Sequence, residues 1–189
     1  MRLRILVLPL AAAMIAGLVW HKLQQDHRRS PETSDRQIAR IQAPPIEAID
    51  AENSITRLKS FLGRHNLLVV FFDGDSGAGA DKTLQHLKQH SAELKAADYH
   101  VIAISSALPQ QNRKTEFPSL FHLLTDPAPI WKVHREWGSA CFDEEAGSPR
   151  QAVFHIDRAG NVAGTSEPVP LDNPDQQIDE LLGLSHGEE

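Results

Sequence analysis

One stretch of the sequence, from Leu67 to Leu94, constrains the fold more than any other. It opens with an uninterrupted apolar run, Leu67 to Phe72, that is too short for most helices and rich in β-branched and aromatic residues. Such a run is typical of a strand buried on both faces. A glycine-rich loop, Asp73 to Ala80, comes next. The segment after it carries leucines at spacings of three and seven, which predicts a helix whose apolar face covers a sheet.

The loop between this strand and this helix is the place where an α/β protein usually keeps its chemistry. Free backbone N–H groups and the helix dipole point into it. Here the loop holds no reactive side chain except carboxylates, so Asp73 and Asp75 are candidate binding residues. Short acidic loops can ligate a hard cation. The alternative, which we favour, is that Asp75, Ser76 or Asp81 caps the helix and that the glycines permit positive φ in the turn.

Length, charge and cysteine content limit the possible functions. A chain of 189 residues suffices for one globular domain with appendages. The net charge of −6, without clustered Lys and Arg in the globular part, argues against a nucleic-acid surface. The single cysteine, Cys141, excludes an internal disulfide and a cysteine-only metal site. No cofactor is implied.

The N-terminal segment is apolar. Two arginines are followed by a charge-free run from Ile5 to Trp20, longer than a typical signal-peptide core, and no small-x-small cleavage site follows it. We therefore expect an uncleaved signal anchor over residues 1–22, with a cleaved signal peptide as the alternative. Residues 23–45 are polar and contain proline breakers, as expected of a tether. The globular domain is expected on the exported, periplasmic or extracytoplasmic, side of a membrane.

The remaining chain predicts one α/β domain over residues 46–184, followed by a tail over residues 185–189. A small hairpin and a helical turn precede the central strand, and Tyr99 to Ser105 forms a second strand, so the intervening helix, Thr83 to Lys95, makes a right-handed βαβ unit. The later elements expected are a short helix or loop at Pro109 to Glu116, a strand at Phe121 to Leu124, a helix with Ile130, Val133 and Trp137 on one side, a polar loop at Ser139 to Pro149, a hairpin of Ala152 to Asp157 with Val162 to Thr165, and a final helix from Asn173 with Ile178, Leu181 and Leu182 inward.

Four segments carry a family resemblance: ITRLKSFLGRHNLLVVFF, YHVIAISS, FHLLTDPAPIWKVHREWG and AVFHIDRAGNV. In order and spacing they resemble the alkyl hydroperoxide reductase/thiol-specific antioxidant family, the peroxiredoxin-like redoxins of the thioredoxin superfamily. The resemblance spans about Ile46 to Leu182. It implies a thioredoxin-like fold, a central mixed β-sheet flanked by helices, and it implies thiol peroxidase or oxidoreductase chemistry. Membrane-tethered thioredoxin relatives of cytochrome c maturation are a second group with this fold.

The resemblance also implies where the reactive groups should stand. The family's peroxidatic cysteine, at the first turn of the helix, falls on Ala80, its threonine on Gly77 and its arginine on Gln151. A thioredoxin Cys-x-x-Cys pair would fall on Gly77 and Ala80, and the cis-proline of that group on Gln151. Neither the peroxidatic cysteine with its threonine and arginine nor the Cys-x-x-Cys pair with its cis-proline is present at these positions. Arg150 is one residue away from the arginine position and could reach back into the site.

Three other residues are candidates outside the loop. Cys141 is either a displaced reactive thiol or an incidental cysteine, whose acidic neighbours Asp143 to Glu145 would raise its pKa. His86 and His90, four residues apart on the helix with Glu93 on the same side, could bind a metal. They lie opposite the leucine face, so we expect them to be solvent-exposed and without a metal. Trp131 and Trp137 are expected in the core.

Two functions remain open. The first is a membrane-tethered, non-catalytic binding or scaffolding module. It would hold an unknown protein or peptide at the face that corresponds to the family's active site, which comprises residues 73–80 with Arg150 and Gln151. The second is a thiol-dependent oxidoreductase or antioxidant that uses Cys141. The residue chemistry favours the first, whereas the second rests on analogy of fold, which is a weak guide to function.

Overall fold

The computed structural model describes residues 39–112 and 116–184. None of the helices in these two segments is long and apolar enough to cross a membrane. The predicted signal anchor (1–22), most of the predicted tether and the predicted tail (185–189) lie outside the described residues.

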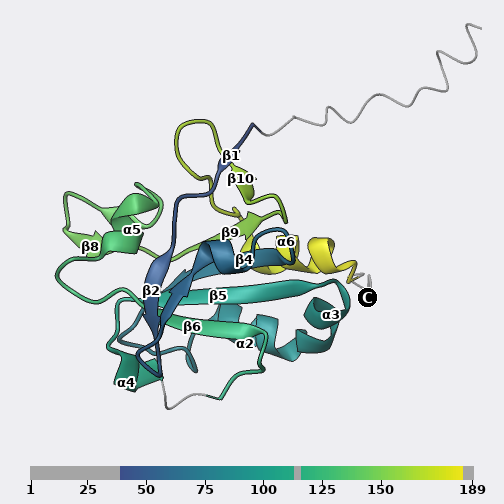
Figure 1. Cartoon of the computed structure of the whole chain (residues 1–189), viewed down its shortest axis with the longest axis horizontal. Coiled ribbons are helices and arrows are strands. Elements are labelled where there is room, and N and C mark those ends of the chain that lie inside the picture. The colour runs from purple at the N-terminus through teal and green to yellow at the C-terminus, as the bar shows by residue number, and fades with distance from the viewer. Residues whose placement is uncertain (1–38, 113–115, 185–189) are drawn as a thin grey trace, which may run out of the picture. The chain divides into compact units, whose positions relative to one another are not determined.

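An eight-stranded mixed sheet organises the domain (Figure 1), in the order β1-β10-β9-β4-β5-β6-β2-β3. The strands β4, β5 and β6 are parallel, and every other neighbouring pair is antiparallel. The strands are β1 (Arg40–Gln42), β2 (Glu47–Asp50), β3 (Ile55–Arg57), β4 (Asn66–Phe72), β5 (Tyr99–Ser105), β6 (Phe121–Thr125), β9 (Ala152–Ile156) and β10 (Asn161–Ala163).

The helices are short. They comprise the 3-10 turn η1 (Leu58–Ser60), α2 (Lys82–Gln89), α3 (Ser91–Ala96), α4 (Pro109–Asn112), α5 (Lys132–Glu136) and α6 (Pro174–Leu182). The single helix predicted over Thr83 to Lys95 is wrong in one respect, because it divides into α2 and α3 at His90 (φ −97°, ψ 27°). The predicted polar loop before β9 contains a small separate hairpin, β7 (Phe142–Asp143) with β8 (Ser148–Pro149).

Strand β4 supplies both hydrophobic cores of the domain. Its side chains alternate between the two faces of the sheet, as strand geometry requires. Leu67, Val69 and Phe71 enter the core that α5 covers with Val133 and with Trp137, the residue at the C-terminal cap of α5. The side chains between them enter the opposite core, which α2 and α3 cover with the predicted leucines and α6 covers with Ile178. The prediction of a strand buried on both faces is therefore confirmed.

Two predicted inward side chains point to solvent instead. Ile130 is 70% exposed because it lies in the turn before α5 and not in the helix itself. Leu181 is 36% exposed, since Ile178 is the residue of α6 that packs on the sheet. The sheet also begins before the predicted boundary at Ile46, because β1 pairs with β10 in the register Ile41 to Val162.

Candidate functional site

A pocket of about 450 Å³ lies where the parallel strands end. The carboxyl ends of parallel strands meet at one edge of a sheet, which is where α/β proteins usually bind ligands. The end of β4 contributes Phe72, and the loop after it contributes Asp73 and Asp75. The loop after β5 contributes Ser106, and the loop after β6 contributes Ala128 and Trp131. The segment leading into β9 contributes Ser148, Pro149, Arg150 and Gln151. The structure thus brings together the predicted binding residues Asp73, Asp75 and Arg150.

The loop after β4 folds around the carboxylate of Asp73. This carboxylate accepts hydrogen bonds from the backbone N–H of Asp75 (3.0 Å) and from the hydroxyl of Ser76 (2.8 Å). The Ser76 hydroxyl, followed by the Asp75 N–H, holds the pKa of Asp73 below its usual value. Gly77 has φ +75° with open space around it, so the backbone conformation is what requires glycine there. The pocket wall therefore carries a fixed negative charge.

The helix after the loop begins as the capping interpretation predicts. The carboxylate of Asp81 accepts a hydrogen bond from the N–H of Leu84 at 2.9 Å. Burial nevertheless raises the pKa of Asp81. Ala80 is exposed immediately before this cap, and its N–H donates to the carbonyl of Gly77 at 3.1 Å. The position that the resemblance assigns to a cysteine thus lies at the start of α2 and holds a methyl group.

Arg150 reaches the pocket but is already paired. Its guanidinium donates to the carboxylate of Asp143, and its backbone N–H donates to the carbonyl of Cys141 at 2.7 Å. The pairing holds Arg150 against the small β7–β8 hairpin. The pocket therefore contains two carboxylates from the loop and one guanidinium whose charge is balanced by Asp143.

Cys141 lies in the core and not in the pocket. Its side chain is fully buried in the cluster that includes Trp137 and Phe154. Burial raises the pKa of the Cys141 thiol far above its ordinary value. The predicted rise in the pKa of Cys141 is therefore caused by burial, and the prediction that neighbouring carboxylates cause it is wrong. Asp143 pairs with Arg150, and Glu144, which is exposed, pairs with Arg135.

Trp131 lines the pocket, whereas the sequence analysis assigned it to the core. It is only partly buried and lines the pocket with backbone in the left-handed region (φ 41°, ψ 48°). The helix after it is held by Asp126, whose carboxylate accepts from the N–H of His134 (2.9 Å) and lies 2.7 Å from Nδ1 of the same residue. Only the position of Trp131 after the third parallel strand could have indicated its place at the pocket.

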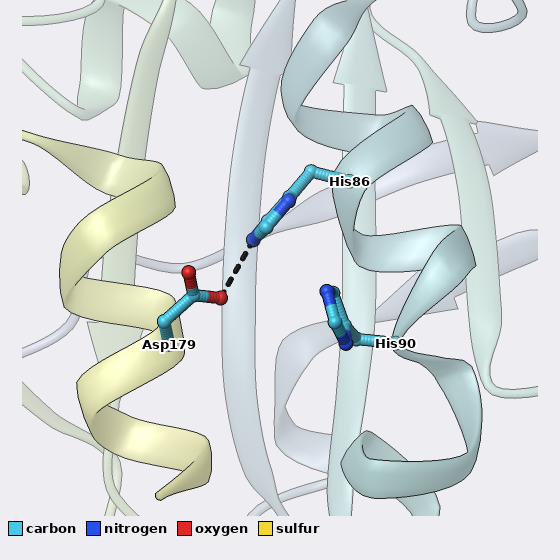
Figure 2. Close-up of side chains that lie close together, drawn as sticks. All are labelled: His86, His90 and Asp179. Carbon is cyan, nitrogen blue, oxygen red and sulfur yellow. Dashed lines mark hydrogen bonds and ion pairs between the residues drawn. The ribbon is translucent and has the colours of Figure 1, made fainter. Parts of the chain in front are cut away.

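The prediction that His86 and His90 are solvent-exposed is wrong. Both are partly buried, because α6 lies beside α2 and places Asp179 2.8 Å from Nε2 of His86 (Figure 2). Within residues 39–112 and 116–184, His86, His90 and Asp179 form the only group of three such side chains that could hold a metal ion. No local sequence pattern indicated Asp179, which lies on a different helix far along the chain.

Comparisons with known proteins agree with this architecture. The model of the AhpC/TSA family matches residues 40–165. Alkyl hydroperoxide reductase E of Mycobacterium bovis is 28% identical over 147 residues, which cover 76% of this chain and 95% of that protein.

Two solved structures share the fold. Peroxidoxin BcpB of Mycobacterium tuberculosis superposes with a TM-score of 0.57 at 19% identity, covering 76% of this chain and 93% of that one. The reduced 2-Cys peroxiredoxin of Plasmodium vivax gives a TM-score of 0.53 at 18% identity, with 75% and 94% covered. The predicted thioredoxin-like fold with a mixed central sheet is confirmed.

Proposed function

The chain belongs to the AhpC/TSA family, and we propose that it is a non-catalytic member that uses the family's active face to bind a partner protein. The observation that carries this proposal is the identity of the residues in the loop after β4 and in the pocket, whose lining includes Gln151 but neither Gly77 nor Ala80. Ala80, Gly77 and Gln151 occupy the positions that the family resemblance assigns to the cysteine, threonine and arginine. The thiol of Cys141 is buried elsewhere, so no thiol lies among the residues that line the pocket.

The chemistry of the pocket suggests what it holds. Asp73 and Asp75 are acidic, and the hydrogen bonds to Asp73 favour its ionised form. Trp131 offers an aromatic surface in the same pocket. A carboxylate pair beside an aromatic ring suits a lysine or arginine side chain. The two large apolar side chains exposed in the loops after β5 and β6, Leu108 and Ile130, favour a peptide segment over a small molecule.

Site-specific photocrosslinking tests the partner proposal. A photoreactive amino acid at Ser148, on the pocket wall, should crosslink a partner protein in cells. The double variant Asp73→Asn, Asp75→Asn should reduce the yield at least fivefold, because it removes the charge that attracts the basic side chain. Asp172→Asn, which alters an exposed carboxylate outside the pocket lining, is the matched control. Equal crosslinking in the double variant and the control would contradict the proposal.

Thiol-dependent peroxide reduction is the second candidate function, and family membership favours it. In that reaction the Cys141 thiolate would attack a peroxide oxygen, forming a sulfenic acid and releasing water or an alcohol. The burial of Cys141 argues against it. We expect no peroxide turnover by the full chain above that of Cys141→Ser. Turnover that this substitution abolishes would establish the oxidoreductase and overturn the binding proposal.

We also propose that the domain is tethered to a membrane with its globular part exported. The charge-free run from Ile5 to Trp20 supports this, because it approaches the ~20 apolar residues that span a bilayer. The full chain should stay in the membrane fraction after alkaline carbonate extraction. Release into the supernatant would contradict tethering.

A further inference from the structure

Three side chains that can ligate metals converge between helices α2 and α6. His86 and His90 come from α2 and its C-terminal end, and Asp179 comes from α6. Each offers one ligand atom, and the three atoms lie within 4.8 Å of one another. Figure 2 shows the two imidazole rings standing along α2 on the side that faces the carboxylate of Asp179. The pocket at the end of the parallel strands does not include these residues.

Packing between α2 and α6 holds the three residues together. His86 and His90 are four residues apart, so they share one side of α2. Helix α6 is fixed beside them by Ile178, which is fully buried in the core under α2. The hydroxyl of Thr83 also lies 3.5 Å from the carboxylate of Asp175, one turn before Asp179. The ligands are therefore positioned before any metal arrives, which reduces the cost of ordering them on binding.

The ligand atoms are close to the spacing that zinc requires. Zinc bonds of about 2.1 Å in tetrahedral geometry place ligand atoms roughly 3.4 Å apart. His86 Nε2 and Asp179 Oδ1 are 2.8 Å apart, and the largest separation in the group is below 4.8 Å. Zinc binding therefore requires the three side chains to rotate so that these separations change toward the zinc spacing. The existing contact between His86 and Asp179 would be replaced by two metal bonds.

The donor set points to the kind of metal. Two imidazoles and one carboxylate suit Zn²⁺ better than Ca²⁺ or Mg²⁺, which prefer oxygen ligands alone. Asp179 is nearly buried, with 7% of its surface exposed, so an ion at this point would be partly shielded from water. We propose that His86, His90 and Asp179 form a zinc site that joins α6 to α2.

Glu93 supports this assignment. Its Oε2 atom is buried, accepts no hydrogen bond from the described residues and lies 3.9 Å from Nδ1 of His90. A carboxylate beside the second ring nitrogen of a ligating histidine fixes the orientation of the ring and raises its basicity. Glu93 would orient the His90 ring if this 3.9 Å separation closed to hydrogen-bond distance, and water would complete the fourth position on the ion.

The test is a calorimetric titration of the full chain with zinc chloride. The chain is purified with a tag that lacks histidine, because a polyhistidine tag would itself bind the metal. One equivalent of zinc should bind with micromolar or tighter affinity. His90→Gln and Asp179→Asn should each weaken that binding at least tenfold. Excess zinc, at about 100 times the dissociation constant, should raise the Tm of the native chain by about 5 to 10 °C.

Two controls separate this site from other histidines and from misfolding. His122→Gln alters a histidine of a different cluster and should bind zinc like the native chain. His86→Gln keeps an N–H donor for Asp179, so without zinc this variant should have the native Tm. Adding zinc should not raise the Tm of this variant. Stoichiometric binding that survives both His90→Gln and Asp179→Asn overturns the proposal. The proposal is also overturned if His122→Gln weakens zinc binding as much as His90→Gln and Asp179→Asn do, or if the native chain does not bind zinc with micromolar affinity.

Discussion

At the scale of single residues, a row of three histidines on one side of the sheet has the clearest physical consequence. His65 Nδ1 lies 2.8 Å from a carboxylate oxygen of Asp98, and its ring is 4.0 Å from that of His100. His100 Nδ1 lies 3.1 Å from Nε2 of His122. That last contact needs one donor and one acceptor, so the two rings cannot both be protonated while it persists. Burial lowers the pKa of His100 and lowers that of His122 to about 4.

This row predicts a loss of stability in acid. Above pH 6.5, His122 is neutral in both the folded and the unfolded chain. Between pH 6.5 and 4 the unfolded chain binds a proton that the folded chain does not. The contribution of His122 to the free energy of unfolding therefore falls by at most about 3 kcal/mol, and by about 2 kcal/mol once solvent screening of this partly exposed ring is allowed for. Urea unfolding at pH 7 and pH 4.5 measures this change. The variant His122→Phe has no group to protonate at this position, so its free energy of unfolding should decrease less than that of the native chain between pH 7 and pH 4.5. An identical decrease in both proteins would contradict the assignment of this effect to His122.

At the scale of elements, the start of α2 depends on one side chain. Asp81 accepts the hydrogen bond of the Leu84 N–H, which would otherwise have no partner in the first turn of the helix. Asp81→Ala should lower the free energy of unfolding by about 1 kcal/mol and the Tm by about 2 to 4 °C. Thermal denaturation followed by circular dichroism measures the change. Asp81→Asn retains the acceptor, so a decrease as large as that of the alanine variant would show that the cap is not responsible.

The element scale also shows where sequence patterns stop being informative. Strands β4 and β5 were predictable because both are long apolar runs. A helix cap was also predictable because carboxylates and a serine precede the leucine pattern, although the sequence left Asp75, Ser76 and Asp81 as alternatives and the structure uses Asp81. The break at His90 was not, since α3 continues the same leucine face through Leu94. The position of Asp179 depends on how α6 packs against α2. No local pattern encodes such a contact between helices.

At the scale of the whole domain, the sheet includes the residues just before the predicted boundary. Strand β1 pairs with β10, and Arg40 forms an ion pair with Asp157 at 2.9 Å. The carbonyl of Gly160 accepts from the N–H of Ala43 at 2.9 Å and from the side chain of Gln42 at 2.7 Å. The sequence suggested a polar tether here because prolines follow directly. Pairing with a strand more than a hundred residues later could not be read from the segment itself.

Truncation tests this boundary. A fragment of residues 39–184 should unfold at a Tm at least 5 °C above that of residues 46–184, because the shorter fragment loses β1 and exposes Val162 of β10. Differential scanning calorimetry of the two fragments gives the comparison. Equal Tm values would mean that β1 adds nothing to the stability of the sheet.

The other end of the sheet bears on how copies of the protein behave at high concentration. Strand β3 is an edge strand, and its Ile55 is 56% exposed opposite Ile49 of β2, which is 39% exposed. Unpaired edges of this kind can recruit a second chain and seed aggregation. Here the edge is only three residues long and carries Arg57, which pairs with Glu47 at 3.0 Å. A short edge ending in a charge disfavours edge-to-edge polymerisation, and this would matter most for a protein concentrated on a surface.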